Sequence, residues 1–165
     1  MRPRRRAAPD SPVPPAGSAW TLALRLLMRR DYTSAELRDR LLDKGVTDAD
    51  ADDCVARLTA DRTLDDRRVA LAHVRTARDI KGRGRLRIER ELIQRGIAPA
   101  LAHEAVAILP GDDEQAQIAR VLARKRLPPR LSLAERRRLF QHLLRRGFPA
   151  DAISKALRDR GPEED

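Results

Sequence analysis

Leu41-Leu-Asp-Lys-Gly45-Val46-Thr47 is the first of three closely similar stretches in this 165-residue chain. Its pattern returns in Leu92-Ile-Gln-Arg-Gly96-Ile97-Ala98 and in Leu143-Leu-Arg-Arg-Gly147-Phe148-Pro149: two aliphatic residues, any residue, Lys or Arg, Gly and a bulky apolar residue. The three glycines lie 51 residues apart in both intervals. Equal spacing of a pattern this long indicates a tandem structural repeat.

Each element of the pattern suits the C-terminal end of a helix. Glycine adopts the left-handed conformation that commonly follows the last helical turn. The preceding Lys or Arg lies favourably at the negative end of the helix dipole, and the following apolar residue can fold back onto that turn. We therefore expect Gly45, Gly96 and Gly147 to be the turns between the second and third helices of three copies.

Start signals precede the second helix in each copy. Thr33-Ser-Ala-Glu36 and Ser132-Leu-Ala-Glu135 read as capping boxes, and Gly82-Arg-Gly84 breaks the chain before a helix over 86–95. First helices are expected over 19–30, 66–80 and 113–126, and third helices begin near Thr47, Pro99 and Pro149. Asp65 and Asp66 could form an acid–base or metal-binding pair, but capping of the following helix is favoured.

The expected fold is all-α, with three tandem three-helix repeats over residues 19–63, 64–109 and 110–160. These repeats form an elongated array that can curve. Apolar residues recur at helical spacing, and only four residues are Trp, Tyr or Phe. Residues 1–18 hold five of the eleven prolines and are expected to form a disordered basic tail. Residues 161–165 form a short acidic end.

The chain carries 35 basic and 25 acidic residues, a net charge of +10. The first repeat has eight basic and nine acidic residues, the second ten and six, and the third thirteen and six. This excess predicts affinity for a polyanion or for an acidic protein surface, concentrated on the second and third repeats. Of the basic residues, 31 are Arg and four are Lys, and a GC-rich genome alone would favour Arg over Lys. A plainer interpretation of the charge runs also stays open, since such runs are usually solvated helix faces.

The candidate binding residues are the basic clusters of the second and third repeats. They are Arg78, Lys81, Arg83, Arg85, Arg87, Arg90 and Arg95 in the second repeat, and Arg124, Lys125, Arg126, Arg130, Arg136, Arg137, Arg138, Arg145 and Arg146 in the third.

The sequence offers little catalytic chemistry. It has no phosphate-binding loop motif, and Lys81-Gly-Arg-Gly84 follows a helix rather than a strand. Its three histidines and single cysteine, Cys54, have no metal-ligand spacing, so we expect no metal, no cofactor and no enzymatic activity. Neither a secretory signal nor an apolar stretch of about 20 residues is found, which predicts a cytoplasmic protein.

Together these stretches resemble the RecX family of recombinase regulators over residues 19–158. The most specific blocks are Arg30-Asp-Tyr32-Thr-Ser34-x-Glu36-Leu37, Leu64-Asp65-Asp66-x-x-Val69-Ala70, Ile88-x-x-Glu91-Leu92-x-x-Arg95-Gly96-Ile97 and Leu144-x-Arg146-Gly147-Phe148. The family often has aromatic residues where this chain has Val69 and His73.

The resemblance implies a protein that binds RecA filaments on single-stranded DNA and inhibits their ATPase, strand-exchange and coprotease activities. This would place it in the regulation of DNA repair, recombination and the SOS response. RecA and single-stranded DNA, bound without sequence preference, are the implied partners of a monomer. Two alternatives stay open: direct DNA binding by helix-turn-helix-like units, and a scaffold for another acidic partner.

Overall fold

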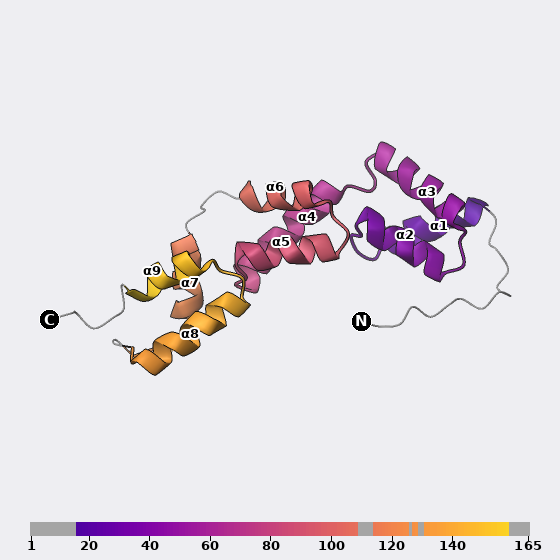
Figure 1. Cartoon of the computed structure of the whole chain (residues 1–165). Helices are drawn as coiled ribbons and strands as arrows, with labels where there is room; N and C mark the ends of the chain where they lie inside the picture. The colour runs from indigo at the N-terminus through magenta and orange to yellow at the C-terminus, as the bar shows by residue number, and fades with distance from the viewer. Residues whose placement is uncertain (1–15, 109–113, 126, 129–130, 159–165) are drawn as a thin grey trace. The chain divides into compact units, whose positions relative to one another are not determined.

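A computed structural model describes residues 16–108, 114–125, 127–128 and 131–158 (Figure 1). Within this part of the chain it has nine α-helices, one π-helical segment and no β-strand. The chain divides into two compact units, one of residues 1–69 with 95–97 and the other of residues 70–94 with 98–165. The all-α fold built from tandem three-helix repeats is thereby confirmed, whereas the elongated array stays a prediction.

The first unit is built around α1 (Ala16–Leu27), α2 (Ser34–Asp43) and α3 (Asp48–Ala60), which pack on one another (Figure 1). Ala23, Leu37, Leu41 and Leu58 are fully buried at their centre. The free thiol of Cys54 belongs to the same core, and its burial raises the pKa of the thiol above the ordinary value. Cys54 is therefore a packed apolar group rather than a nucleophile.

Two three-helix groups follow. The first comprises α4 (Asp66–Arg75), continued by the π-helical segment η1 (Thr76–Ile80), then α5 (Arg85–Gln94) and α6 (Pro99–Ala107). The next comprises α7 (Glu114–Ala123), α8 (Leu133–Arg145) and α9 (Ala150–Arg158). Helix α5 packs on α6 and η1, and α9 packs on both α7 and α8. Phe148 and Ile153 are among the fully buried side chains of the last group.

Helix ends follow local chemistry. Thr33 and Ser132 accept from the backbone N–H of Glu36 and Glu135, whose side chains bond back to form complete capping boxes. After α2, α5 and α8 the chain turns at Gly45, Gly96 and Gly147, with φ of +84°, +84° and +87°. The N–H groups of Val46 and Phe148 return to the carbonyls of Leu41 and Leu143, and both apolar side chains are buried.

Three helices differ from their predicted spans. Helix α1 begins at Ala16, inside the predicted tail, because the last proline of the tail is Pro15 and a helix can start directly after it. The segment predicted as one helix over 66–80 becomes π-helical from Thr76, a widened turn that local periodicity does not reveal. The helix predicted over 113–126 ends at Ala123.

The rest of the predicted tail, the acidic end and residues 109–113 lie outside the described residues. None of the described helices is both long and apolar enough to cross a membrane.

Candidate functional site

Within the first unit, the turn after α5 is held by the beginning of α2; we call this contact the first joint. The buried Thr33 hydroxyl donates a 2.6 Å hydrogen bond to the carbonyl oxygen of Arg95. A side chain at Gly96 would collide with the Cβ of Ala35, so only glycine allows this approach. The first joint therefore fixes the turn through the Thr33 side chain and the Arg95 main chain.

Side chains add an ion pair to the first joint. The Arg95 guanidinium donates from Nε and Nη2 to the two carboxylate oxygens of Glu36, at 2.9 and 3.0 Å. Arg30 approaches the same carboxylate at 3.4 Å. Burial alone would raise the pKa of Glu36, but the bonds from Arg95 and the Thr33 backbone outweigh it and hold this pKa below its ordinary value. In the first joint the carboxylate is thus flanked by two cations.

A second joint, wholly within the second unit, links the beginning of α5 to the turn after α8. The N–H of Gly84 donates to the carbonyl of Arg146 at 2.7 Å, and the N–H of Leu86 donates to the carbonyl of Gly147 at 3.1 Å. A side chain at Gly147 would collide with Arg87, and one at Gly84 would collide with the Gly147 backbone. The second joint is therefore closed by main-chain groups on both sides.

The two joints are related by the 51-residue repeat. Residues 33 and 84 both donate to the carbonyl that precedes a turn glycine, at residues 95 and 146. The side chains differ: Glu36 of the first joint corresponds to Arg87 of the second. Arg146, which corresponds to Arg95, donates to the carbonyls of Lys81 and Gly82 at 2.7 and 3.0 Å.

Glu91 is the carboxylate nearest to the second joint. It forms ion pairs with Arg83 and, at 3.0 Å, with Arg87, and lies 3.2 Å from His73 Nε2. Burial alone would raise the pKa of Glu91, but the bonds from Arg87, Arg83 and His73 hold it below its ordinary value. His73 is therefore a packed side chain with a polar partner.

Other predicted binding residues also have internal partners. Arg85 pairs with Glu114 at 2.7 Å, and Arg136 donates to the carbonyl of Leu157 at 3.1 Å. Arg124 reaches the carbonyls of Asp79 and Ile80, both at 3.2 Å, beside the half-buried Arg78. Through these contacts, several of the predicted binding residues hold neighbouring elements of the second unit together.

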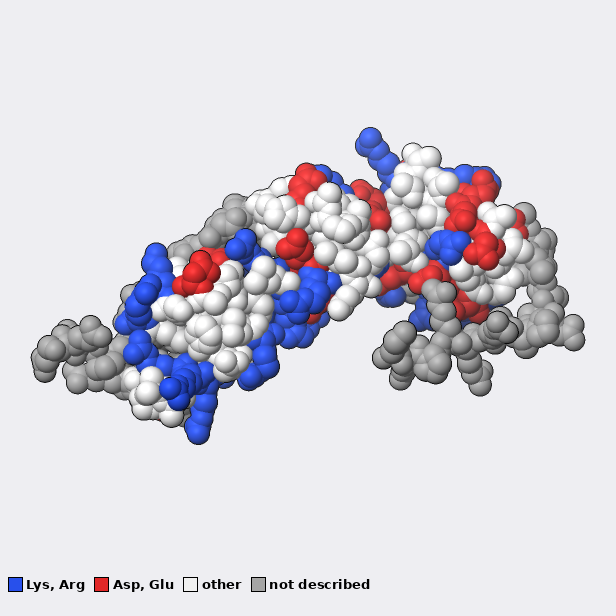
Figure 2. All heavy atoms as spheres, in the orientation of Figure 1, with Lys and Arg blue, Asp and Glu red and all other residues white. Residues whose placement is uncertain are grey.

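The remaining predicted cations are exposed, and the ion pairs among the described residues do not include them. We call this set the basic surface: Lys81, Arg90, Lys125, Arg137, Arg138 and Arg145. Figure 2 shows Lys and Arg side chains gathered over the third three-helix group, whereas Asp and Glu gather over the first group beside α3. Arg126 and Arg130 lie outside the described residues.

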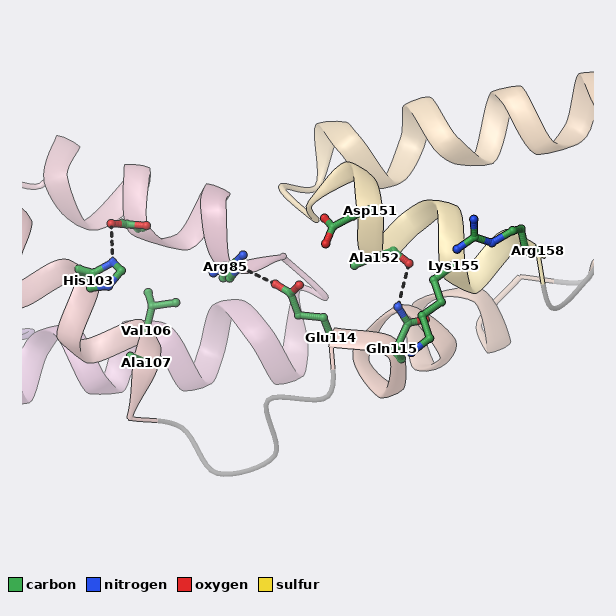
Figure 3. Close-up of a pocket in the computed structure, with 11 residues that line it drawn as sticks. Arg85, His103, Val106, Ala107, Glu114, Gln115, Asp151, Ala152, Lys155 and Arg158 are labelled. Atoms are coloured by element: carbon green, nitrogen blue, oxygen red, sulfur yellow. Dashed lines mark hydrogen bonds and ion pairs between the residues drawn. The ribbon is translucent and has the colours of Figure 1, made fainter.

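A cavity of the second unit measures about 620 Å³ and lies among α5, α6, α7 and α9 (Figure 3). Its charges have both signs, from Arg85, Lys155 and Arg158 on one hand and Glu89, Glu114 and Asp151 on the other. Several of its polar groups bridge helices, as Gln115 does by donating to the Ala152 carbonyl at 2.9 Å. Its mixed charge gives no preference for an anion.

Asp65 and Asp66 serve the helix starts. Asp65 Oδ1 accepts from the N–H of Arg68 at 3.0 Å at the beginning of α4. Asp66 Oδ1 accepts from the N–H of Ser34 at 2.7 Å, at the beginning of α2. Among the residues that the structure describes, no three His, Cys, Asp or Glu side chains gather as a metal site would require.

Sequence reasoning gave no pairing role to three residues of the second unit. Glu91 pairs with Arg83 and Arg87, His142 accepts from Arg146 Nε at 3.0 Å, and Gln117 donates to the Arg78 carbonyl at 2.7 Å. Superposing the copies at 51 residues would have aligned Arg87 with Glu36. The four-residue spacing of Arg87 and Glu91, and of His142 and Arg146, is a helical signal that could have paired them. No sequence signal links Gln117 to Arg78.

These features define an all-α protein of tandem three-helix repeats whose second and third copies are cationic. Models of the first, second and third three-helix domains of RecX match residues 19–58, 65–106 and 112–157. The chain belongs to the RecX family of regulatory proteins.

Individual relatives agree with this placement. The regulatory protein RecX of Bacillus licheniformis is 36% identical over 146 residues, which are 87% of this chain and 55% of that protein. RecX of Trichlorobacter lovleyi is 34% identical over 138 residues, 81% of this chain and 90% of that protein. The chain thus spans about half the length of the Bacillus relative and nearly all of the Trichlorobacter relative.

A solved structure supports the fold alone. The crystal structure of RecX from Lactobacillus salivarius matches with a TM-score of 0.75 at 19% identity, covering 88% of this chain and 96% of that chain.

Proposed function

We propose that this protein binds RecA filaments on single-stranded DNA and inhibits their ATPase, strand-exchange and coprotease activities. It would do so as a cytoplasmic monomer, without a cofactor and without catalysing a reaction of its own. In this role it regulates DNA repair, recombination and the SOS response. Membership of the RecX family supports the proposal, and the basic surface supplies its physical basis.

The observation that carries the proposal is the set of predicted binding cations that stay exposed and outside the ion pairs of the described residues. Lys81, Arg90, Lys125, Arg137, Arg138 and Arg145 all belong to the second and third repeats. Cations that meet phosphates release condensed counterions, so binding to a DNA-containing filament gains free energy that falls with added salt. Arg95, which is already paired with Glu36 of the first repeat, would instead hold the second repeat against the first.

The proposal divides the work between the repeats. The basic surface would contact the DNA phosphates and acidic groups of the filament. The first repeat, with eight basic and nine acidic residues, would contact protein. This division rests on charge, since no group in the described residues suggests chemistry on a substrate.

The test is the DNA-dependent ATPase of the cognate RecA on single-stranded DNA, titrated with the full-length protein at two salt concentrations. We expect inhibition below one protein per RecA protomer, weakened at the higher salt. Inhibition that appears only when the protein saturates the DNA would indicate competition for DNA and would contradict filament binding. A parallel titration with DNA alone measures that competition directly.

Direct, sequence-selective DNA binding by helix-turn-helix-like units is not favoured by membership of this family. Binding assays with DNA of several sequences distinguish the two functions. A filament regulator binds bare DNA without sequence preference, whereas a transcription factor prefers particular base pairs by several kcal/mol.

A further inference from the structure

We propose that the second joint is a phosphate-binding site, filled by a backbone phosphate of a single nucleic-acid strand. The site is a cavity of about 390 Å³ lined by Lys81, Arg83, Arg87, His142, Arg145 and Arg146. All six residues belong to the second unit. The choice of a nucleic-acid strand rests on the function proposed above, whereas the choice of a phosphate rests on the cavity itself.

Comparison with the first joint indicates what the cavity lacks. There, the Glu36 carboxylate accepts from Arg95 and lies 3.4 Å from Arg30. The repeat places Lys81, Arg87 and Arg146 at the positions of Arg30, Glu36 and Arg95. Both flanking cations are kept, but the carboxylate between them is replaced by a third cation. An anion from outside the chain can therefore take the place of the missing carboxylate.

The charge of the cavity is not cancelled by its surroundings. Of the five cations in its lining, Arg83 and Arg87 share the single carboxylate of Glu91. Arg146 is held by the neutral carbonyls of Lys81 and Gly82, which orient the guanidinium without neutralising it. Lys81 and Arg145 are exposed and take no part in the ion pairs of the described residues. The cavity thus keeps a clear excess of positive charge.

His142 contributes a neutral polar group to the wall. Its Nε2 accepts a 3.0 Å hydrogen bond from Arg146 Nε, which leaves Nδ1 as the protonated nitrogen. Desolvation, together with Lys125, Arg146 and Arg145, lowers the pKa of His142 below its ordinary value. Near neutral pH the excess charge therefore comes from fixed Lys and Arg cations.

A phosphate suits this cavity better than a protein carboxylate does. In the first joint one carboxylate already pairs with the two cations around it, whereas the cavity of the second joint is lined by five cations. Arginine forks bind phosphate oxygens in pairs, and lysine adds a point charge. A strand also presents one further phosphate per nucleotide to exposed cations of the second unit outside the cavity, such as Lys125.

The first experiment measures thermal stability of the full-length protein in sodium phosphate and in sodium chloride of equal ionic strength. Binding to the folded state stabilises it, so phosphate should raise the Tm of the wild-type protein by about 2–4 °C. The pocket variant Lys81→Gln/Arg145→Gln removes two side chains that line the cavity and have no described ion pair. It should lose most of this increase while keeping its Tm in chloride.

The matched control is Arg75→Gln/Lys155→Gln, which also removes one Arg and one Lys from exposed positions of the second unit. Neither residue lines the cavity. This control should keep the full increase in phosphate, because its cavity is intact. General effects of phosphate on protein hydration act on both variants alike. An equal loss in both variants would overturn the site.

A local readout comes from NMR of the histidine side chains at neutral pH. Added phosphate should shift the resonances of His142, which lines the cavity, and leave those of His103, which lies elsewhere in the second unit. Shifts of equal size at both histidines, or at neither, contradict binding in the second joint.

Fluorescence anisotropy with labelled oligo-dT then identifies the source of the phosphate. The pocket variant should bind about 5–20-fold more weakly than wild type at low salt, and its log–log salt slope should fall by about 0.7 for each lost phosphate contact. The control should lose about two-fold. The pocket variant could instead bind oligo-dT as tightly as wild type does but no longer bind an acidic protein in the absence of DNA. That result would assign the cavity to protein carboxylates and refute the phosphate-binding proposal.

These results are separable from the RecA proposal. Phosphate stabilisation and the His142 shift need neither RecA nor DNA, so they can succeed even if wild-type protein fails to inhibit the ATPase. Conversely, normal ATPase inhibition by the pocket variant would leave the filament proposal intact and refute the nucleic-acid role of the cavity.

Discussion

Arg95 and Glu36 form a two-pronged ion pair, with Nε and Nη2 of the guanidinium 2.9 and 3.0 Å from the two carboxylate oxygens. Both side chains are 23% exposed, so the pair is largely removed from solvent. It ties residues 59 positions apart in the sequence. The sequence predicts that Arg95 contacts a filament or DNA. Because Arg95 is bonded to Glu36, we propose that it stabilises the first joint instead.

Breaking this pair should destabilise the first unit. We expect Glu36→Gln and Arg95→Gln each to lower the free energy of unfolding, with a coupling of about 1–3 kcal/mol in a double-mutant cycle measured by urea denaturation. The exposed pair Arg38–Asp52 is the comparison and should show a much smaller coupling. Purely additive effects of the Glu36 and Arg95 substitutions would contradict a joint held by this pair.

Two of the glycine turns allow the cost of a left-handed backbone to be measured separately from the cost of a steric collision. Gly45 and Gly147 have nearly the same φ, but a side chain at Gly45 meets no atom within 4 Å, whereas one at Gly147 collides with Arg87. Gly45→Ala should cost about 1–2 kcal/mol for the left-handed backbone alone. Gly147→Ala should cost at least 2 kcal/mol more, because the second joint must open.

Chemical denaturation of the two alanine variants measures this difference. Equal losses of stability would mean that the second joint contributes nothing to the fold in solution.

His142 should make stability depend on pH just below neutrality. Its folded pKa lies below the unfolded value of about 6.5, so its contribution is complete above that pH and is lost as the pH falls through the folded pKa. The Tm of wild type should therefore fall more between pH 7.5 and 5.5 than that of His142→Gln, which cannot be protonated. An NMR titration of His142 with a midpoint at or above 6.5 would show that this histidine does not cause the pH dependence of stability.

Neutralising exposed cations should weaken filament inhibition without unfolding the protein. For Arg90→Gln/Arg137→Gln/Arg138→Gln we expect a half-inhibitory concentration about 5–20-fold higher at low salt and a smaller difference at high salt. The control Arg25→Gln/Arg29→Gln/Arg75→Gln removes three exposed arginines outside the basic surface. ATPase titrations that move equally for both variants would show that net charge, rather than this surface, governs inhibition.

Local rules account for what could be predicted about the fold. A capping box such as Thr33–Glu36 occupies four residues, and a turn such as Leu143–Phe148 occupies six, so their physical causes lie next to one another in sequence. The 51-residue interval then extends each local signal to three copies. The π-helical turn at Thr76 has no such short pattern and was missed.

The candidate site was harder to predict because charge alone does not show how a cation is bonded. Arg83 and Arg145 look alike in sequence, yet Arg83 pairs with Glu91 and the side chain of Arg145 is exposed. Their difference depends on partners brought together by tertiary packing. Composition therefore predicts cationic second and third repeats, but it does not show that Arg146, for example, also donates to backbone carbonyls.

The use of a main-chain carbonyl as the acceptor in both joints has a consequence for how such a chain can diversify. Because the carbonyls of residues 95 and 146 accept from the Thr33 hydroxyl and the Gly84 N–H, a substitution at residue 36 or 87 can invert the local charge while these two bonds remain. Gene duplication followed by single substitutions can then specialise one copy for cohesion and another for ligands, with no redesign of the backbone.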